Sequence, residues 1–282
     1  MNGIIININP IALSIGGLDL RWYGIFVALA VIAAGFITHF EAKRRSFNVD
    51  ISTLLMVVLL AGMLGARLFH VVDNWSFYAT QPEMIWHISQ GGLAIWGGLL
   101  GGGIAVVVFA RWQRLPLLKL LDVMVPGVIV GLIIGRLACV VNGDTVGSIT
   151  NLPWAFIYTN PGAMIRPELF GQPVHPYAVY EMLWNGLGLA LILWLRHRPL
   201  RDGSLFLAFV VIYAAGRFLL TFIRVENEVF LGLQQAQLIA LGMIAFAAVL
   251  AIVLRHIRQG GTTPGDQNDS LDRLASETKL VR

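Results

Sequence analysis

Charged residues and cysteine are both scarce in this chain of 282 residues. Asp, Glu, Lys and Arg make up 13% of it, against roughly 25% in an average soluble domain. Hydrophobic residues make up 57%, and the mean hydropathy is +0.73. A soluble domain of this size could not cover its surface with so few charges. The deficit argues against a soluble enzyme, a nucleic-acid-binding protein and a disordered protein, and it favours a membrane protein.

The sequence also lacks the motifs of several common functional sites, which excludes further classes of function. Cys139 is the only cysteine, so the chain has no internal disulfide and no thiolate metal cluster. There is no His-Glu-x-x-His motif, no carboxylate pair at metal-ligand spacing and no glycine-rich phosphate loop, so we expect no metal and no cofactor. Basic runs do not alternate with aromatic residues, so we expect no nucleic-acid partner. Residues 1–20 contain no Lys or Arg, and we expect them to be retained as an outer interfacial segment rather than removed as a signal.

Seven apolar runs are each long enough to cross a hydrocarbon core of about 30 Å as a helix. We predict an all-α polytopic membrane protein with seven transmembrane helices in one domain, residues 1–258, and a disordered polar cytoplasmic tail, residues 259–282. We expect residues 142–175 to form a long outer loop, and loops of this length usually have a function. The predicted spans are Trp22–Thr38, Ser52–Val72, Leu93–Ala110, Leu117–Val141, Pro176–Leu195, Ser204–Phe222 and Leu231–Leu254.

Lys and Arg near the span ends set the orientation. Basic clusters follow the first, third, fifth and seventh spans, whereas the alternate loops contain only Arg166 and Arg224. By the positive-inside rule, the clusters mark the cytoplasmic side. We therefore expect the N-terminus outside and the C-terminus inside. The same asymmetry accounts for the net charge of +4.

Three arginines lie inside predicted spans rather than in loops, namely Arg67, Arg136 and Arg217. Each costs about 2.5–3.5 kcal/mol at a helix centre on insertion scales. All three fall in the last third of an outward-running span, so they share one depth in the outer leaflet. Any one of them is also explained by snorkelling or by an ion pair with Glu181 or Asp144. As a set they indicate an anionic ligand held by planar donors, and a lipid phosphate is the first candidate.

Other polar side chains gather at the same depth, from six of the seven predicted helices. This predicts a polar cavity that opens outward. Gly97 and Gly98 have the spacing of small residues that lets helices pack closely. Gly143 and Gly147 flank Asp144 and allow turns beside a headgroup. The remaining polar residues at this level are Tyr23, Trp96, Asn142, His175, Tyr180, Glu181, Tyr213, Thr221 and Arg224.

The segment Gly135-Arg136-Leu137-Ala138-Cys139-Val140-Val141-Asn142-Gly143-Asp144-Thr145-Val146-Gly147 resembles the signature of bacterial prolipoprotein diacylglyceryl transferases. These are seven-span enzymes that begin lipoprotein maturation. The resemblance extends over residues 20–255. Further matching segments, in the family's order, are Trp22-Tyr23-Gly24, Gly65-Ala66-Arg67, Gly91 to Gly98, His175-Pro176, Tyr180-Glu181, Tyr213 and Gly216-Arg217.

The resemblance implies transfer of the diacylglyceryl group of phosphatidylglycerol to the lipobox cysteine thiol of a preprolipoprotein, with release of glycerol phosphate. It implies a multi-pass protein of the bacterial cytoplasmic (inner) membrane whose partners are phosphatidylglycerol, preprolipoprotein signal peptides and the lipid bilayer. The catalytic residues are then expected to be Arg136, Arg217, Tyr23, Asp144 and His175. The lipid-binding residues are expected to be Arg136, Asn142, Gly147, Arg67, Trp96, Gly97, Gly98, Tyr213, Glu181 and Arg224.

The resemblance and the chemistry of the reaction together give the expected roles. We assign Arg136 to the phosphate and Arg217 to the leaving group or the thiolate, because guanidinium groups stabilise a developing anion and lower a thiol pKa. Asn142 and Asp144 would bind the glycerol hydroxyls, and Tyr23 and Tyr213 would position these groups. The proton acceptor stays open between His175, Glu181, Asp144 and water.

The chain departs from the family pattern at several positions. Trp96 stands where some relatives carry a histidine, and Cys139 where the signature often has Asn. Asp144 replaces Glu, Ala178 replaces Gln, and Thr221 stands where relatives carry Glu. We expect a divergent active member, and a homologue with redirected lipid chemistry is the alternative.

Two other classes stay as alternatives. An anion- or lipid-binding transporter would fit an outward cavity, but such folds usually contain inverted repeats, and the two halves of this chain show no convincing similarity. Prenyl or phosphatidyl transferases usually need paired Asp-rich motifs for Mg²⁺, which the sequence lacks. Flux across proteoliposomes, compared with lipid transfer by the same preparation, would separate the transporter from the enzyme.

Overall fold

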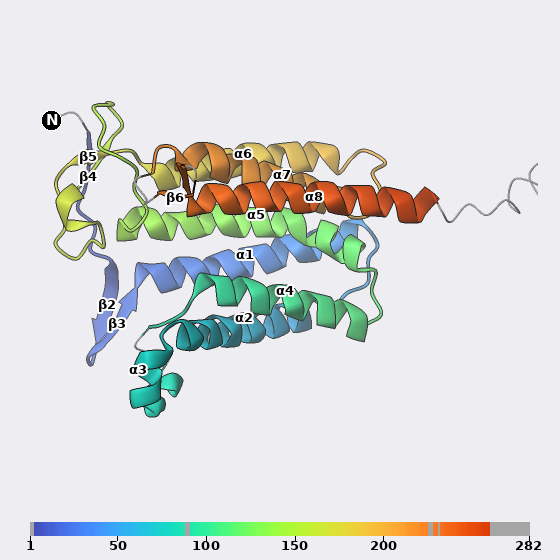
Figure 1. The fold of residues 1–282 in the computed structure, drawn as a ribbon, viewed down its shortest axis with the longest axis horizontal. Coiled ribbons are helices and arrows are strands. Elements are labelled where there is room, and N and C mark those ends of the chain that lie inside the picture. The colour runs from blue at the N-terminus through green and yellow to red at the C-terminus, as the bar shows by residue number, and fades with distance from the viewer. Residues whose placement is uncertain (1–2, 88–90, 225–227, 231, 260–282) are drawn as a thin grey trace, which may run out of the picture. The chain divides into compact units, whose positions relative to one another are not determined.

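The computed structural model describes residues 3–87, 91–224, 228–230 and 232–259. Within these ranges seven helices are long and apolar enough to cross a membrane, which confirms the predicted fold class (Figure 1). The orientation of the termini stays a prediction. The seven helices are α1 (Trp22–Arg44), α2 (Ile51–Asp73), α4 (Ile95–Trp112), α5 (Leu117–Asn142), α6 (Tyr177–Leu195), α7 (Ser204–Thr221) and α8 (Gln235–Gln259).

Short strands and helical turns lie between the long helices, and the sequence analysis did not anticipate them. Strands of two to five residues are too short to show a hydrophobic alternation. The predicted interfacial segment forms, from Gly3 onward, the first three strands. These elements are β1 (Ile4–Ile6), β2 (Ile11–Ile15), β3 (Leu18–Arg21), α3 (Trp75–Thr80), η1 (Pro82–Trp86), β4 (Phe156–Tyr158), η3 (Pro167–Leu169), β5 (Pro173–Val174), β6 (Glu228–Phe230) and β7 (Leu233–Gln234).

The chain forms two compact units. The first contains Met1–Phe209 and Phe222–Val225, and the second contains Val210–Thr221 and Glu226–Arg282. The prediction of one transmembrane domain stays a prediction. Apart from Gln259, which ends α8, the predicted polar tail lies outside the described residues.

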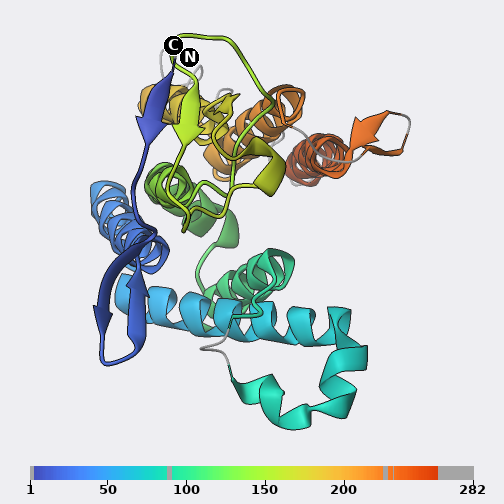
Figure 2. The same ribbon diagram turned by 90° about the vertical axis from the view of Figure 1, so that its left-hand side faces the viewer.

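In the first unit, α5 packs along both α1 and α6, while α2 packs along α4. Figure 2 looks onto the end of this unit where β1 lies in parallel beside β4 and the antiparallel β2–β3 hairpin lies next to α1; we call it the strand end. Gly97 on α4 faces α2 so closely that an added Cβ would collide with the carbonyl group of Gly65. This contact confirms the close helix packing expected from the glycine spacing.

The opposite end of the first unit, which we call the basic end, contains two buried acids. Glu41 on α1 accepts hydrogen bonds from Arg44, Arg45 and, at 3.1 Å, from Arg196 at the end of α6. Glu41 is only 2% exposed, so these hydrogen bonds and ion pairs offset the cost of burying its charge. The ion pairs therefore tie the ends of α1 and α6 together.

Asp122 on α5 is the second buried acid. Its carboxylate accepts the backbone N–H groups of Gly203 at 2.9 Å and Phe206 at 2.8 Å. These N–H groups belong to the start of α7, where an α-helix leaves its first donors without intrahelical partners. Asp122 therefore caps α7 from a different helix, and Arg45 lies 3.8 Å away as its counter-ion.

Arg67 fixes the connection between α2 and α4. Its guanidinium donates hydrogen bonds to the carbonyl groups of Met84, Ile85, Gly91 and Gly92. The same group lies 5.3 Å from the ring centroid of Tyr78. Arg67 is 6% exposed, so the loop carbonyls replace the water that the charge would otherwise need.

We predict that Asp122→Ala lowers the stability of the chain by about 1–2 kcal/mol, because two helix-capping hydrogen bonds are lost at a buried site. Thermal unfolding in detergent, followed by tryptophan fluorescence, measures the change. Asp73→Ala is the matched control, because Asp73 is an exposed acid at the end of α2. Equal melting temperatures for the two variants would contradict the capping role.

We predict that Arg67→Lys loosens the outer loop, because an ammonium group cannot reproduce the planar fork that reaches four carbonyl groups. Hydrogen exchange of the amides of Met84–His87 and Gly91–Trp96 should become about tenfold faster or more, as expected for the loss of charge-assisted hydrogen bonds. Arg111→Lys, at the end of α4, serves as the control. Unchanged exchange in this loop would show that Arg67 does not hold it.

Candidate functional site

The candidate site begins with Arg136, close to the C-terminal end of α5. Its Nε atom lies 2.6 Å from Oε2 of Glu181 on α6, whose side chain is 5% exposed. Its Nη1 atom also donates to Sγ of Cys139, one turn further along α5, at 3.7 Å. An ion pair with a second helix fixes the direction of the guanidinium group. This pair is one of the structural alternatives that the sequence left open for Arg136.

Tyr23 and Asp144 complete this cluster. Tyr23 opens α1 at the strand end and is 45% exposed, and its hydroxyl lies within electrostatic range of Arg136, Cys139 and Asp144. Asp144 follows α5 directly and is exposed. We call Tyr23, Arg136, Cys139, Asp144 and Glu181 the Arg136 site. It contains one guanidinium, two carboxylates, a phenol and the only thiol of the chain.

The loop after α5 owes its shape to Gly143, which ends the helix with φ +75° and donates its N–H to the carbonyl of Cys139. Most residues adopt this left-handed conformation only with strain, which explains glycine at this position. Asn142 is buried, and its side-chain amide donates to Sδ of Met164 at 3.1 Å. The backbone carbonyl of Asn142 accepts the backbone N–H of Met164 at 2.8 Å. Asn142 therefore joins the end of α5 to the long loop that follows it.

Tyr158 on β4 fastens the same loop from the other side. Its hydroxyl donates to the carbonyl of Val140 at 2.8 Å. Burial, and then the nearby Asp144 and Cys139, raise the pKa of Tyr158 above its ordinary value, so the hydroxyl stays protonated and remains a donor.

Gly147 joins three segments. Its N–H donates to the carbonyl of His175 at 3.0 Å, and the next N–H, of Ser148, donates to the carbonyl of Ile223 at 2.9 Å. A Cβ on Gly147 would lie 2.8 Å from Cβ of His175 and 3.0 Å from the Ile223 carbonyl oxygen. A side chain would therefore separate the segments that the glycine brings together.

His175 takes part in a small hydrogen-bonded chain. Nε1 of Trp154 donates to the Tyr180 hydroxyl at 2.9 Å, and that hydroxyl lies 3.2 Å from Nδ1 of His175. Partial burial lowers the pKa of His175 below its ordinary value of about 6.5. The imidazole is therefore neutral at pH 7. The side-chain partner of His175 in this chain is Tyr180.

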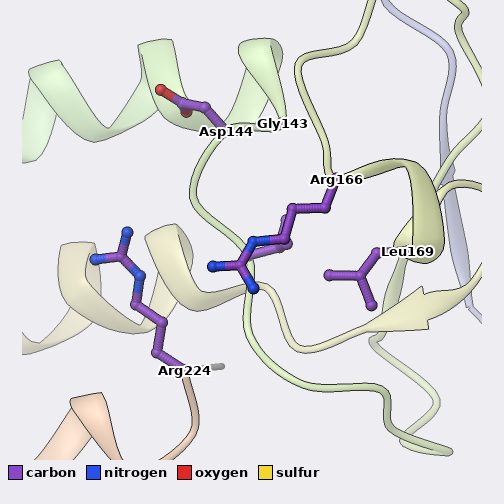
Figure 3. A pocket seen from close by; sticks show the side chains of 6 residues that line it. Gly143, Asp144, Arg166, Leu169 and Arg224 are labelled. Atoms are coloured by element: carbon purple, nitrogen blue, oxygen red, sulfur yellow. The ribbon is translucent and has the colours of Figure 1, made fainter. Parts of the chain in front are cut away.

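A pocket lies beside the Arg136 site, lined by Gly143, Asp144, Val146, Arg166, Leu169 and Arg224, and we call it the Arg166 pocket. In Figure 3 the guanidinium groups of Arg166 and Arg224 face the same open space, and the Asp144 carboxylate points away from them. The guanidinium of Arg224 lies 5.5 Å from the ring centroid of the buried Tyr177. Asp144 belongs to both the pocket and the Arg136 site.

Several predicted site residues lie elsewhere. Gly98, like Gly97, faces α2, with its nearest neighbours the Gly62 carbonyl and Ala66. Trp96 is 40% exposed in the first turn of α4. Gly97 and Gly98 thus contribute to helix packing, and Arg67 holds the loop between α2 and α4. The lipid-binding roles expected for these three residues and for Trp96 stay predictions.

Tyr213 and Arg217 belong to the second unit and are described there alone. Both lie on α7, and the Thr221 hydroxyl donates to the carbonyl of Arg217, one turn earlier. The roles expected for Tyr213 and Arg217 stay predictions.

Sequence reasoning did not assign Arg166, Met164, Tyr158 or Trp154 to the site. Arg166 had a usable signal, because it breaks the depletion of basic residues on the outer side. The other three act through loop contacts for which the sequence has no periodic signal. Among the described residues, no group of three His, Cys, Asp or Glu side chains could hold a metal ion.

Comparison with known proteins adds the family. Residues 10–253 match the family model described as prolipoprotein diacylglyceryl transferase. A Dehalococcoides mccartyi protein named phosphatidylglycerol–prolipoprotein diacylglyceryl transferase is 37% identical over 250 residues, which cover 88% of this chain and 94% of the relative. Proteins of the same name from Pediococcus pentosaceus and Synechococcus elongatus are 34% and 36% identical, and the matches cover 88% and 86% of this chain and 90% and 86% of the relatives. This chain therefore belongs to the prolipoprotein diacylglyceryl transferase family.

Proposed function

We propose that this chain transfers the diacylglyceryl group of phosphatidylglycerol to the lipobox cysteine thiol of a preprolipoprotein in the bacterial cytoplasmic membrane. Its family and its seven apolar helices support the proposal. The observation that carries it for this chain is the Arg136 site, where a guanidinium fixed by Glu181 lies beside an exposed carboxylate and a tyrosine.

The chemistry defines what the site must do. The peptide thiolate attacks the glyceryl carbon that bears the phosphate, so a sulfur–carbon bond forms as the carbon–oxygen bond breaks. The electron pair of the broken bond stays on the phosphate oxygen, and the thiol proton passes to a base. Glycerol phosphate leaves with more negative charge than the phosphodiester had. A positioned cation is therefore the main catalytic requirement.

Arg136 is suited to the phosphate. Its ion pair with Glu181 runs through Nε, and its side chain is 23% exposed rather than sealed. A guanidinium oriented before the substrate arrives loses little freedom when it binds. Arg217 on α7 is the proposed second cation, for the leaving group or the thiolate, with Tyr23 and Tyr213 as positioning groups.

Asp144 is the proposed acceptor for the headgroup glycerol hydroxyls. It is exposed, it interacts electrostatically with Tyr23, and its carboxylate accepts a hydrogen bond from the Thr145 hydroxyl at 3.4 Å. The side-chain amide of Asn142, by contrast, already donates to Sδ of Met164. We therefore assign Asn142 mainly to the shape of the loop and leave hydroxyl recognition to Asp144.

His175 is the proposed proton acceptor. Glu181 is engaged by Arg136, whereas the His175 imidazole is neutral at pH 7 because burial lowers its pKa. When Nδ1 donates its hydrogen to the Tyr180 hydroxyl, Nε2 has a free lone pair for the thiol proton. Asp144 or water takes this role if His175 does not.

We predict that purified protein transfers labelled diacylglycerol from phosphatidylglycerol to a lipobox peptide, and that Arg136→Ala lowers kcat/KM by about 10²-fold or more. Arg136→Lys should retain part of the activity, because it keeps the charge but not the fork. Arg111→Ala is the control for net charge, and thermal unfolding tests whether each variant folds.

The peptide with Ser in place of Cys should stay unlabelled. Cys139→Asn removes the only thiol of the enzyme, so any label that remains must be on the peptide. Absence of transfer by folded protein, or equal transfer by wild type and Arg136→Ala, would reject the proposal. Phospholipid binding that needs Arg136 but gives no transfer would indicate the redirected homologue.

We predict that kcat/KM rises with pH along an acid limb whose midpoint lies below about 6.5, because the lowered pKa keeps His175 able to accept a proton above that range. In His175→Gln this limb should disappear, and the activity at pH 7 should fall about 10²-fold or more. Tyr180→Phe should retain the limb and shift its midpoint. If His175→Gln keeps the wild-type limb, the base is Asp144 or water.

A further inference from the structure

Arg166 and Arg224, the two cations of the Arg166 pocket, have no role in the transfer step described above. We propose that this pocket binds a glycerophosphate group next to the Arg136 site and receives the phosphate when the carbon–oxygen bond breaks. This inference rests on the proposed function. The same group can reach the pocket either as the headgroup of phosphatidylglycerol or as free glycerol phosphate, and the experiment below separates these two sources.

The charges in the pocket favour an anion. Arg166 and Arg224 come from different segments and face one space (Figure 3). Arg166 is exposed, and its guanidinium has no hydrogen-bond or ion-pair partner in the part of the chain that the structure describes. Two guanidinium groups that face the same space repel each other until an anion lies between them. Phosphate oxygens match their planar donors.

Hydrogen bonds hold the backbone at or next to both arginines. The carbonyl of Arg166 accepts the N–H of Leu169 at 2.9 Å, and Leu169 packs into a small buried cluster with Tyr158 and Val174. The segment before Arg224 is held by the Ser148 N–H on the Ile223 carbonyl, and the guanidinium itself lies over the ring of Tyr177. The pocket therefore has a rigid base, which limits the entropy lost on binding.

The reaction supplies an anion of the right kind. The phosphodiester of phosphatidylglycerol has one negative charge, whereas a phosphomonoester such as glycerol phosphate has about −1.5 to −2 at pH 7. A pocket with two arginines gains more from the monoester than from the diester. The negative charge formed at the Arg136 site is thus attracted toward Arg166 and Arg224, away from the new thioether.

Asp144 sets the direction of the bound group. It lines the pocket, but its carboxylate points away from the two guanidinium groups (Figure 3). A carboxylate repels phosphate and accepts hydrogen bonds from hydroxyl groups. The phosphate end would therefore lie on the arginines, with the glycerol hydroxyls toward Asp144. Because Asp144 also belongs to the Arg136 site, it connects the two positions. Asp144 and Arg166 are both exposed, which leaves a path to water for a soluble product.

The test compares Arg166→Gln with Arg111→Gln, which removes the same charge from the end of α4. Isothermal titration of the full-length protein in detergent, with no peptide present, measures binding of glycerol phosphate, inorganic phosphate and glycerol. Kinetics with the lipobox peptide then give the KM for phosphatidylglycerol and the inhibition constant for glycerol phosphate. Arg166→Lys tests whether the charge alone restores binding.

We expect Arg166→Gln to weaken binding of glycerol phosphate about five- to tenfold, as for loss of one charge-assisted contact, with no change for Arg111→Gln. Glycerol alone should not bind measurably. An unchanged KM for phosphatidylglycerol would identify free glycerol phosphate as the occupant, and a KM raised by the same factor would identify the lipid headgroup. Either result supports the pocket.

Two results would overturn the inference. One is that wild-type protein does not bind glycerol phosphate, and the other is that Arg166→Gln matches Arg111→Gln in binding, inhibition and KM. Failure of the proposed function looks different, because the protein would then bind glycerol phosphate through Arg166 while transferring nothing to the peptide. Transfer that depends on Arg136 but not on Arg166 would reject the pocket alone.

Discussion

A charged side chain within a hydrocarbon layer has to find its hydrogen bonds inside the protein, because lipid chains offer none. The buried charges of this chain obey that constraint in three ways. Glu41 collects arginines from two helices, Asp122 accepts the free N–H groups at the start of another helix, and Arg67 is surrounded by loop carbonyls. Each arrangement joins segments far apart in the sequence, so the same bonds that satisfy the charges also define the helix contacts.

Arg136 satisfies the constraint differently. Its partner Glu181 supplies one carboxylate, and its side chain keeps more exposure than Arg67 does. A cation that is oriented in advance and keeps some exposure is suited to bind a phosphate that comes and goes. The loop that follows α5 is held by Gly143, Asn142 and Gly147, so the groups around Arg136 stay in place without a ligand.

The sequence predicted the seven helices because runs of apolar residues are a property of the chain itself. It also predicted that Arg136, Glu181 and Asp144 belong to one outer layer, because helix direction and depth follow from the span order. It did not separate the roles of Arg67 and Arg136, since both are arginines near the outer end of a span. Their difference lies in what faces them, carbonyl groups in one case and a carboxylate in the other. The sequence did not assign Arg166 to the site, because its place in an anion pocket depends on Arg224. Arg224 lies far along the chain, and only the folded loops bring the two residues into one pocket.

The partners of the intramembrane arginines also set an order for biogenesis. All the hydrogen bonds of Arg67 end on residues between α2 and α4, and these two helices pack mainly on each other. This helical hairpin can enter the bilayer with its charge already satisfied, before any later helix has been synthesised. The ion pair of Arg136 instead reaches Glu181, which follows the entire loop between α5 and α6. The ion pair between α5 and α6 can therefore form only after α6 has been synthesised, later than the hydrogen bonds of the α2–α4 hairpin.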